Sequence, residues 1–116
     1  MIAIVDDDRS VLTALGSLIR SLGYRVRLFN CAEDFVAAQM AGPDCLICDI
    51  NLSGMSGWDL WKLMEETGQI VPTILITAYL DEMDKTTTRK GLTIFAKPFD
   101  ADTLAEAILR LTAPAG

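Results

Sequence analysis

The amino-acid sequence predicts a single α/β domain built on a doubly wound parallel sheet, and three observations support this fold class. Short runs rich in Ile, Val and Leu alternate with segments of helical periodicity along the chain. Most of these runs are continuously apolar, which is typical of strands covered on both faces of a parallel sheet. The length of 116 residues suits one hydrophobic core, so residues 1–116 are expected to form one domain.

Five runs are the predicted strands, covering residues 2–5, 24–29, 45–48, 72–76 and 93–96. The second run alternates between polar and apolar side chains, as a partly exposed strand does. The third run contains Cys45 and Cys48, which lie three residues apart and would therefore point to opposite faces of the sheet. The chain has no histidine and no second cysteine pair, so we expect core residues rather than a zinc or redox site.

The first and last helices are the most regular of the five that the periodicity predicts. The first covers residues 9–22, with Asp8 as its N-cap and Gly23 after its last turn. Its expected apolar stripe consists of Val11, Ala14, Leu15, Leu18 and Leu22. Asp100 is expected to cap the last helix, which ends near Pro114. The apolar residues of that helix are Leu104, Ala107, Ile108 and Leu111.

Three further helices are predicted between these two. Asn30 with Glu33 three residues later predicts the start of a second helix carrying Phe35, Val36 and Met40. Ser56 with Asp59 resembles a capping box that opens a third helix with Leu60, Leu63 and Met64. The fourth, residues 81–90, has three consecutive threonines, which are β-branched and lower its helix propensity.

The composition excludes several classes of function. A net charge of −6 with scattered basic residues argues against direct nucleic-acid binding by this domain. No apolar run approaches the ~18 residues of a membrane span, and the N-terminal apolar stretch leads directly into three aspartates, unlike a secretory signal. The domain is therefore expected to work in the cytoplasm, with neither nucleic acid nor membrane as its own ligand.

Four of the five predicted strands lead into a chemically useful residue. The first is followed by Asp6 and Asp7, the third by Asp49, the fourth by Thr77 and the fifth by Lys97. A polar loop after a strand or a helix cap would explain one or two of these positions, but four are explained better by a shared site. Ligands bind outside the carboxyl ends of strands in open parallel sheets, and neighbouring strands lie ~4.8 Å apart.

The three carboxylates would repel one another, and Lys97 offsets only one negative charge. A divalent cation with oxygen ligands would neutralise the rest, and Mg²⁺ suits a few carboxylates with water and a phosphate. The set then resembles equipment for phosphoryl transfer, with a carboxylate nucleophile and with Thr77 and Lys97 on phosphoryl oxygens. Because the chain has no histidine, a phosphohistidine donor must be a different molecule.

Over nearly its full length the sequence resembles the receiver domain of two-component response regulators. The stretches that carry the resemblance are IVDDDRSV (4–11), CDINLSGMSGWDL (48–60), ITA (76–78) and AKPF (96–99). In this order and spacing the combination is highly specific, although any one stretch alone would be weak. The sequence at residues 55–58 and 97–99 is most similar to that of the nitrogen-fixation type of regulator, which usually carries a DNA-binding output domain.

The resemblance implies a flavodoxin-like (βα)5 fold with strand order 2-1-3-4-5, and a role for each site residue. It implies that Asp49 accepts the phosphoryl group, that Asp7 binds Mg²⁺ directly and that Asp6 binds it largely through water. It also implies that Asn51 gives its backbone carbonyl to the metal and that Thr77 and Lys97 contact the phosphoryl group. The catalytic set is then Asp49, Thr77 and Lys97, and the metal set is Asp6, Asp7, Asp49 and Asn51.

The resemblance also implies partners and a mode of action. The phosphoryl donor would be a sensor histidine kinase or a phosphotransfer protein. The domain would not be an enzyme on other substrates, because it would catalyse only its own phosphorylation and dephosphorylation. Its output would act through a further domain, a separate target or a homodimer that uses the fourth helix, the fifth strand and the last helix.

The sequence departs from the family pattern at several positions. Ser53 stands where the family usually has proline, which predicts a less rigid loop. Ile94 replaces the aromatic residue that usually couples phosphorylation to the surface, with Phe95 one position away. These changes predict a weaker switch, with residues 80–90 carrying more of the response. Tyr79 lies two residues after Thr77 and is expected to shield the aspartyl phosphate.

Two alternatives remain open at this point. A receiver-like module that no longer uses phosphorylation would explain the altered switch but not the complete acidic pocket. A haloacid-dehalogenase-like phosphatase would use Asp6, Asp8 and Ser10 as its signature, but would leave Asp49 without a role.

Overall fold

A five-stranded parallel sheet forms the centre of the protein. The computed structural model describes residues 1–38, 43–68, 71–77, 92–96 and 100–112. The strands are β1 (Ile2–Val5), β2 (Val26–Phe29), β3 (Cys45–Asp49), β4 (Thr73–Thr77) and β5 (Leu92–Ala96). Their order is β2-β1-β3-β4-β5 and every neighbouring pair is parallel, which confirms the predicted fold class and strand order.

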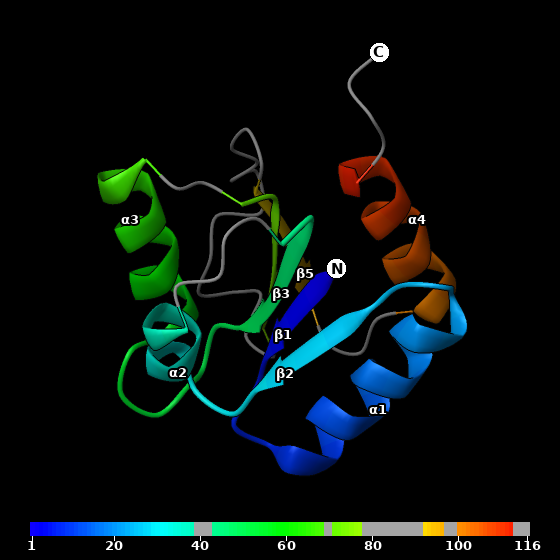
Figure 1. Ribbon diagram of the computed structural model, residues 1–116, viewed down its shortest axis with the longest axis horizontal. Helices are drawn as coiled ribbons and strands as arrows, with labels where there is room; N and C mark the ends of the chain where they lie inside the picture. Colours follow the sequence, from blue (N-terminus) through cyan, green and yellow to red (C-terminus); the bar gives the residue numbers. More distant parts are fainter. Residues whose placement is uncertain (39–42, 69–70, 78–91, 97–99, 113–116) are drawn as a thin grey trace.

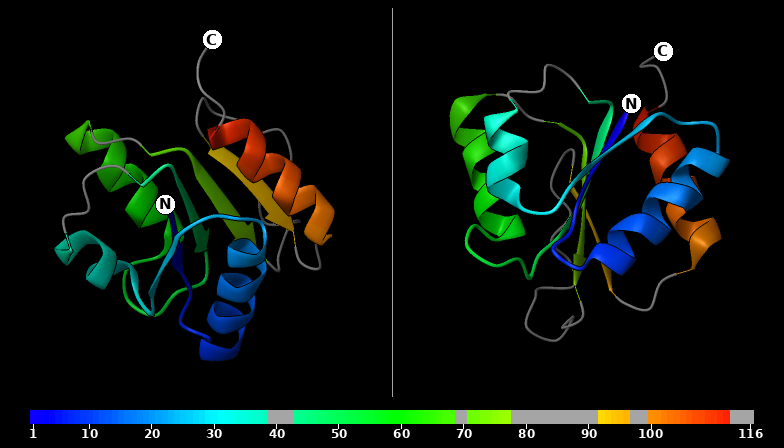
Figure 2. Two further views of the ribbon diagram at one scale, coloured as in Figure 1. Left: turned by 45° about the vertical axis from the view of Figure 1, so that its right-hand side comes forward. Right: turned by 60° about the horizontal axis from the view of Figure 1, so that its bottom comes forward.

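Helices cover both faces of this sheet (Figures 1 and 2). They are α1 (Arg9–Ser21), α2 (Ala32–Ala37), α3 (Gly57–Thr67) and α4 (Ala101–Thr112). One face packs against α2 and α3, and the other against α1 and α4. None of these helices is long and apolar enough to cross a membrane. The helix predicted over 81–90 lies outside the described residues.

Successive residues of each buried strand enter different cores, as the pleat of a strand requires. Cys45 packs with the α1 and α4 side, whereas Cys48 packs with the α2 and α3 side. Burial raises the pKa of the Cys45 thiol to about 12. Burial also raises the pKa of Cys48, and the negative charges of Asp49 and Asp6 add to this rise. The two thiols are therefore separate core residues, as predicted.

The α1 helix buries a different stripe from the predicted one. The residues in contact with the sheet are Leu12, Leu15, Gly16 and Ile19, whereas Ala14 and Leu22 are exposed and Val11 and Leu18 lie at the rim. The reason is the close approach of the helix to β2 at Gly16, where an added Cβ would lie 3.1 Å from a methyl group of Leu28. A helix that turns its glycine to the sheet buries the neighbouring positions on that side.

The helix starts follow the sequence at two places and differ at a third. Asp8 caps α1 by accepting hydrogen bonds from two backbone N–H groups, and Ser56 forms the predicted capping box with Asp59 at the start of α3. In contrast, α2 begins after Cys31, without a side-chain cap. The prediction of Asn30 as its N-cap was therefore wrong. Glu33, which was expected to support that cap, instead accepts a hydrogen bond from the distant Met55 N–H at 3.3 Å.

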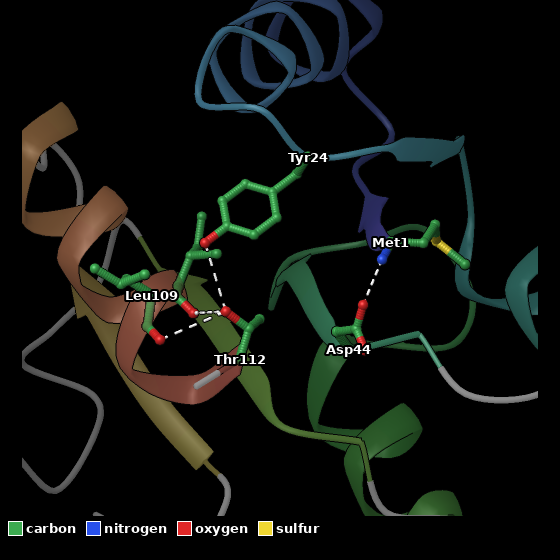
Figure 3. A network of polar contacts seen from close by, with 6 residues as sticks. Met1, Tyr24, Asp44, Leu109 and Thr112 are labelled. Carbon is green, nitrogen blue, oxygen red and sulfur yellow. Dashed lines mark hydrogen bonds and ion pairs between the residues drawn. The ribbon is translucent and has the colours of Figure 1, made fainter. Parts of the chain in front are cut away.

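Contacts at the amino ends of the strands join distant segments of the chain (Figure 3). The Met1 ammonium forms an ion pair with Asp44, and Asp44 N–H donates to the Met1 carbonyl at 2.8 Å. The hydroxyl groups of Tyr24 and Thr112 lie 3.5 Å apart and link the start of β2 to the end of α4. This edge of the sheet is occupied by structural contacts, and the predicted site lies at the opposite edge.

Candidate functional site

The carboxyl ends of the three central strands bring predicted site residues together. Val5 of β1 pairs with Cys48 of β3, so Asp6 follows at the same level as Asp49. Asp49 in turn pairs with Ile76 of β4, and Thr77 is the next residue. The side chains of Asp6, Asp49 and Thr77 are only 2%, 8% and 2% exposed. The structure therefore places two carboxylates and one hydroxyl in a largely buried row.

Asp6 lies in the short β1–α1 loop, residues 6–8, which stabilises its own geometry. Asp8 N–H donates to Asp6 Oδ1 at 2.9 Å. The Asp8 carboxylate then accepts from the Ser10 N–H at 2.9 Å and from the Ser10 hydroxyl at 2.6 Å, which fixes the first turn of α1. Asp8 thus has a structural role here, which removes it as the second catalytic carboxylate that a dehalogenase-like phosphatase would need.

Asp49 precedes the longer β3–α3 loop, residues 50–56. Asn51 N–H donates to Asp49 Oδ1 at 2.9 Å. Ile50 N–H donates to the Ile76 carbonyl at 2.9 Å, and Gly57 N–H returns to the Ile50 carbonyl at 3.1 Å. Ile50 and Leu52 are buried, so this loop has apolar anchors of its own. The Asp49 carboxylate therefore extends from a backbone that is held on both sides.

Gly57 is a supporting residue that the sequence analysis missed. An added Cβ at this position would lie 2.8 Å from the Asp49 carbonyl oxygen and 2.9 Å from Ile50 Cα. Both neighbours are backbone atoms and cannot move aside as a flexible side chain can. The start of α3 can approach the end of β3 this closely only because residue 57 has no side chain. The position of this glycine directly after the Ser56 N-cap was the feature of the sequence that could have identified it.

Asp7 differs from the other two aspartates because it is exposed and contacts the second loop. Its Oδ2 atom accepts from both the backbone N–H and the Oγ hydroxyl of Ser53, each at 3.3 Å. Within the described part of the chain, no three acidic, cysteine or histidine side chains are grouped closely enough to hold a metal ion. Asp7 is thus beside the site but oriented towards Ser53.

The negative charges of Asp6 and Asp49 affect a neighbouring buried group. The charges of Asp49 and Asp6 both raise the pKa of the buried Cys48 thiol beneath them, after the larger effect of burial. Both carboxylates therefore act on the same low-dielectric region, where like charges interact strongly. All side-chain donors available here, from Asp6, Asp7, Asp49 and Thr77, are oxygen atoms, which fits a hard divalent cation or a phosphoryl group.

Some predicted site residues can be placed and others cannot. Asn51 is exposed at the start of the β3–α3 loop, next to Asp49. Ile94 of β5 is half-buried and packs with the core on the α2 and α3 side. It pairs with Leu75 of the neighbouring strand β4. Lys97 and Tyr79 lie outside the described residues, so their predicted contacts stay predictions.

Comparisons with known proteins agree with this geometry. The family model described as the response regulator receiver domain matches residues 2–109. The chain is 40% identical to the response regulator protein TmoT of Ectopseudomonas mendocina over 93% of this chain and 50% of TmoT. It is also 31% identical to the sporulation initiation phosphotransferase F of Bacillus subtilis, over 92% of this chain and 89% of that protein.

A solved structure has the same fold. The crystal structure of the receiver domain of NtrX from Brucella abortus matches with a TM-score of 0.85 at 24% identity, over 99% of this chain and 100% of that one. The match covers nearly the whole of this chain but only about half the length of the response regulator TmoT. By sequence and by fold, this chain belongs to the receiver domains of the response regulators of two-component systems.

Proposed function

We propose that the domain accepts a phosphoryl group on Asp49 from a phosphohistidine of a separate sensor histidine kinase or phosphotransfer protein. The observation that carries this proposal is the position of Asp49 at the end of the central strand β3, where it is nearly buried, level with Asp6 and one residue short of Thr77 on β4. A carboxylate in that place extends from a backbone held by hydrogen bonds and is largely shielded from water, which favours transfer by positioning.

The reaction joins a carboxylate oxygen to phosphorus and breaks the phosphorus–nitrogen bond of the donor. Asn51 N–H donates to Asp49 Oδ1 and orients the carboxylate, one oxygen of which attacks the phosphorus atom in this proposal. The donor nitrogen leaves with the bonding electron pair, and the product is an aspartyl phosphate. Thr77, at the end of β4, is the hydroxyl that donates to a phosphoryl oxygen in this proposal, and Lys97 is the cation that binds another.

Mg²⁺ is the proposed cofactor, held by Asp6, Asp7, Asp49 and the backbone carbonyl of Asn51. The buried Asp6 and Asp49 pair and the purely oxygen donor set fit this cation. When bound, it would neutralise the charge of the carboxylates and of the incoming phosphoryl group. The residues of the chain supply the rest, since they orient the acceptor and exclude water from most of its surface.

The domain would act as a switch in the cytoplasm rather than as an enzyme on other substrates. Its output would be a linked domain or a partner, which the half-length match to TmoT favours. A homodimer through the segment 81–90, β5 and α4 is one route for that output. Leu109, which is 65% exposed on α4, is an apolar residue available to such a contact.

The test is phosphorylation by acetyl phosphate with Mg²⁺, read by intact-protein mass spectrometry. The wild-type protein is expected to gain one phosphoryl group, and Asp49→Asn is expected to gain none. Asp34→Asn, an exposed aspartate of α2, is the matched control and should behave as the wild type. Full phosphate incorporation in Asp49→Asn would overturn the assignment of the acceptor.

A further inference from the structure

Ser53 makes the contact between the β3–α3 loop, which follows Asp49, and the β1–α1 loop, which contains Asp6 and Asp7. Its backbone N–H and its hydroxyl both donate to the same atom, Asp7 Oδ2, at 3.3 Å each. We call this pair of hydrogen bonds the Ser53–Asp7 clasp. Proline has neither of these donors, so the residue that is usual in the family cannot form a clasp. The feature therefore requires a residue with both a backbone N–H and a hydroxyl group at this position.

The loop around Ser53 is anchored well enough to hold Asp7. Leu52, the preceding residue, is buried and donates its N–H to the Ile50 carbonyl at 3.1 Å. Two residues after Ser53, Met55 N–H donates to the Glu33 carboxylate at 3.3 Å. Ser53 thus extends from a segment that is fixed on both sides, and its two donors set the orientation of the Asp7 carboxylate.

The clasp competes with cation binding. A carboxylate oxygen accepts about two hydrogen bonds, so the two donors of Ser53 occupy Asp7 Oδ2. In this arrangement no three acidic side chains of the described residues come together in a metal-binding group. For Asp7 to join Asp6 and Asp49 around a cation, its carboxylate must therefore change orientation, and in this proposal the change breaks the two contacts of Oδ2 with Ser53.

We propose that Ser53 is a positioning residue that holds Asp7 in a metal-free orientation and thereby weakens Mg²⁺ binding. The proposal rests on the proposed function, since it concerns the same metal ligands. Without a cation, the clasp satisfies a carboxylate that stands beside two others of the same charge. When a cation binds, the free energy of the two hydrogen bonds is lost. The free energy of Mg²⁺ binding is then less favourable by that amount, and the apparent affinity is lower.

The experiment is a Mg²⁺ titration of the wild-type protein, Ser53→Ala and Ser53→Thr, followed by proton–nitrogen correlation NMR. Ser53→Ala lacks the hydroxyl donor, so its Kd for Mg²⁺ should fall about threefold to tenfold, the factor that one net hydrogen bond corresponds to. Ser53→Thr keeps both donors and should stay within about twofold of the wild type. In the wild type, the Ser53 amide signal should shift as Mg²⁺ saturates the site.

Two further variants separate a positioning role from a general loop effect. Ser17→Ala removes an exposed hydroxyl from α1 and should leave the Kd unchanged. In an Asp7→Asn background, Ser53→Ala should no longer strengthen binding if Ser53 acts through the Asp7 carboxylate.

The outcomes distinguish this inference from the proposed function. If neither the wild type nor Ser53→Ala binds Mg²⁺, both proposals are wrong. If the wild type binds Mg²⁺ but Ser53→Ala binds it equally well or more weakly, only the clasp proposal is overturned. A Ser53 amide signal that is unmoved at saturating Mg²⁺ would also overturn it.

Discussion

Two loops deliver the aspartates to the same edge of the sheet, but they are stabilised in different ways. The β1–α1 loop consists of Asp6, Asp7 and Asp8, and its hydrogen bonds stay mostly within residues 6–11. The β3–α3 loop covers residues 50–56 and depends on groups that are far away in the sequence. Those groups are the Ile76 carbonyl and the Glu33 carboxylate, and the absent side chain at the adjoining Gly57 lets the start of α3 approach β3.

The difference shows where a site is locally determined and where it is determined by packing. In the short loop, the Asp6 carboxylate accepts from the nearby Asp8 N–H and the helix cap follows directly, while the Asp6 N–H donates to the Phe29 carbonyl of β2 at 3.1 Å. The long loop begins directly after Asp49, and its path is set by contacts from α2, β4 and α3. Substitutions at the outer contacts of the long loop should therefore disturb the site more than substitutions inside the short loop.

The largest effect is expected for Gly57→Ala. The new methyl group would lie within 3 Å of two backbone atoms at the end of β3, so the start of α3 must move. We expect a loss of about 2–3 kcal/mol in the free energy of unfolding, measured with urea. Gly16→Ala is the control, because the nearest neighbours of its added methyl group are flexible side chains, those of Leu28 and Arg20. Equal losses in the two variants would show that the contact with β3 is not special.

A smaller effect is expected for Gly54→Ala in the middle of the long loop. Gly54 has φ +77°, which costs an L-residue about 1–2 kcal/mol, and an added Cβ would lie 2.5 Å from Glu33 Oε2. Gly68→Ala is the control, since it has φ +73° and no atom near the new Cβ. The difference in unfolding free energy between the two variants isolates the contact with α2.

A double variant tests whether the difference between Gly54→Ala and Gly68→Ala comes from the contact with Glu33. Glu33→Ala in the Gly54→Ala background removes the clashing carboxylate and should bring the loss close to that of Gly68→Ala. If Gly54→Ala and Gly68→Ala are equally destabilised from the start, the contact between α2 and the long loop has no energetic weight, and the contrast between the two loops becomes weaker.

The smallest effect is expected inside the short loop, for Asp8→Ala. The variant loses the side-chain cap of α1, which typically costs about 1 kcal/mol. Asp8→Asn keeps an oxygen acceptor at the cap and should be close to the wild type in thermal unfolding. Because Asp8 N–H still donates to Asp6 in both variants, phosphorylation of Asp49 should continue. Loss of phosphorylation in Asp8→Ala would mean that the short loop is less self-contained than its hydrogen bonds suggest.

The sequence was sufficient for features that depend on neighbouring residues. The buried strands, the Ser56 and Asp59 capping box and the order of reactive residues at strand ends all follow from short-range patterns. The buried stripe of α1 was mispredicted because several apolar stripes were available and Gly16, a contact with β2, decided between them. The role of Glu33 was missed for a similar reason, since its partner Met55 lies 22 residues further along the chain.

The same limit applies to the site. The convergence of Asp6, Asp49 and Thr77 was predictable because parallel strands end at a common edge. The orientation of Asp7 was not, because it depends on which group in another loop offers hydrogen-bond donors. The identity of Ser53 was noted as a departure, but a serine alone does not reveal that its N–H and hydroxyl point at the same oxygen.

The separation of Cys45 and Cys48 has a practical consequence for spectroscopy. Both thiols are buried in different cores and their pKa values are raised, so the reactive thiolate form is scarce at neutral pH. Cys31 is the more accessible thiol, and it immediately precedes α2, two residues before Glu33. A single fluorescent or spin label attached there, without mutation of the other cysteines, would report on the surroundings of the β3–α3 loop.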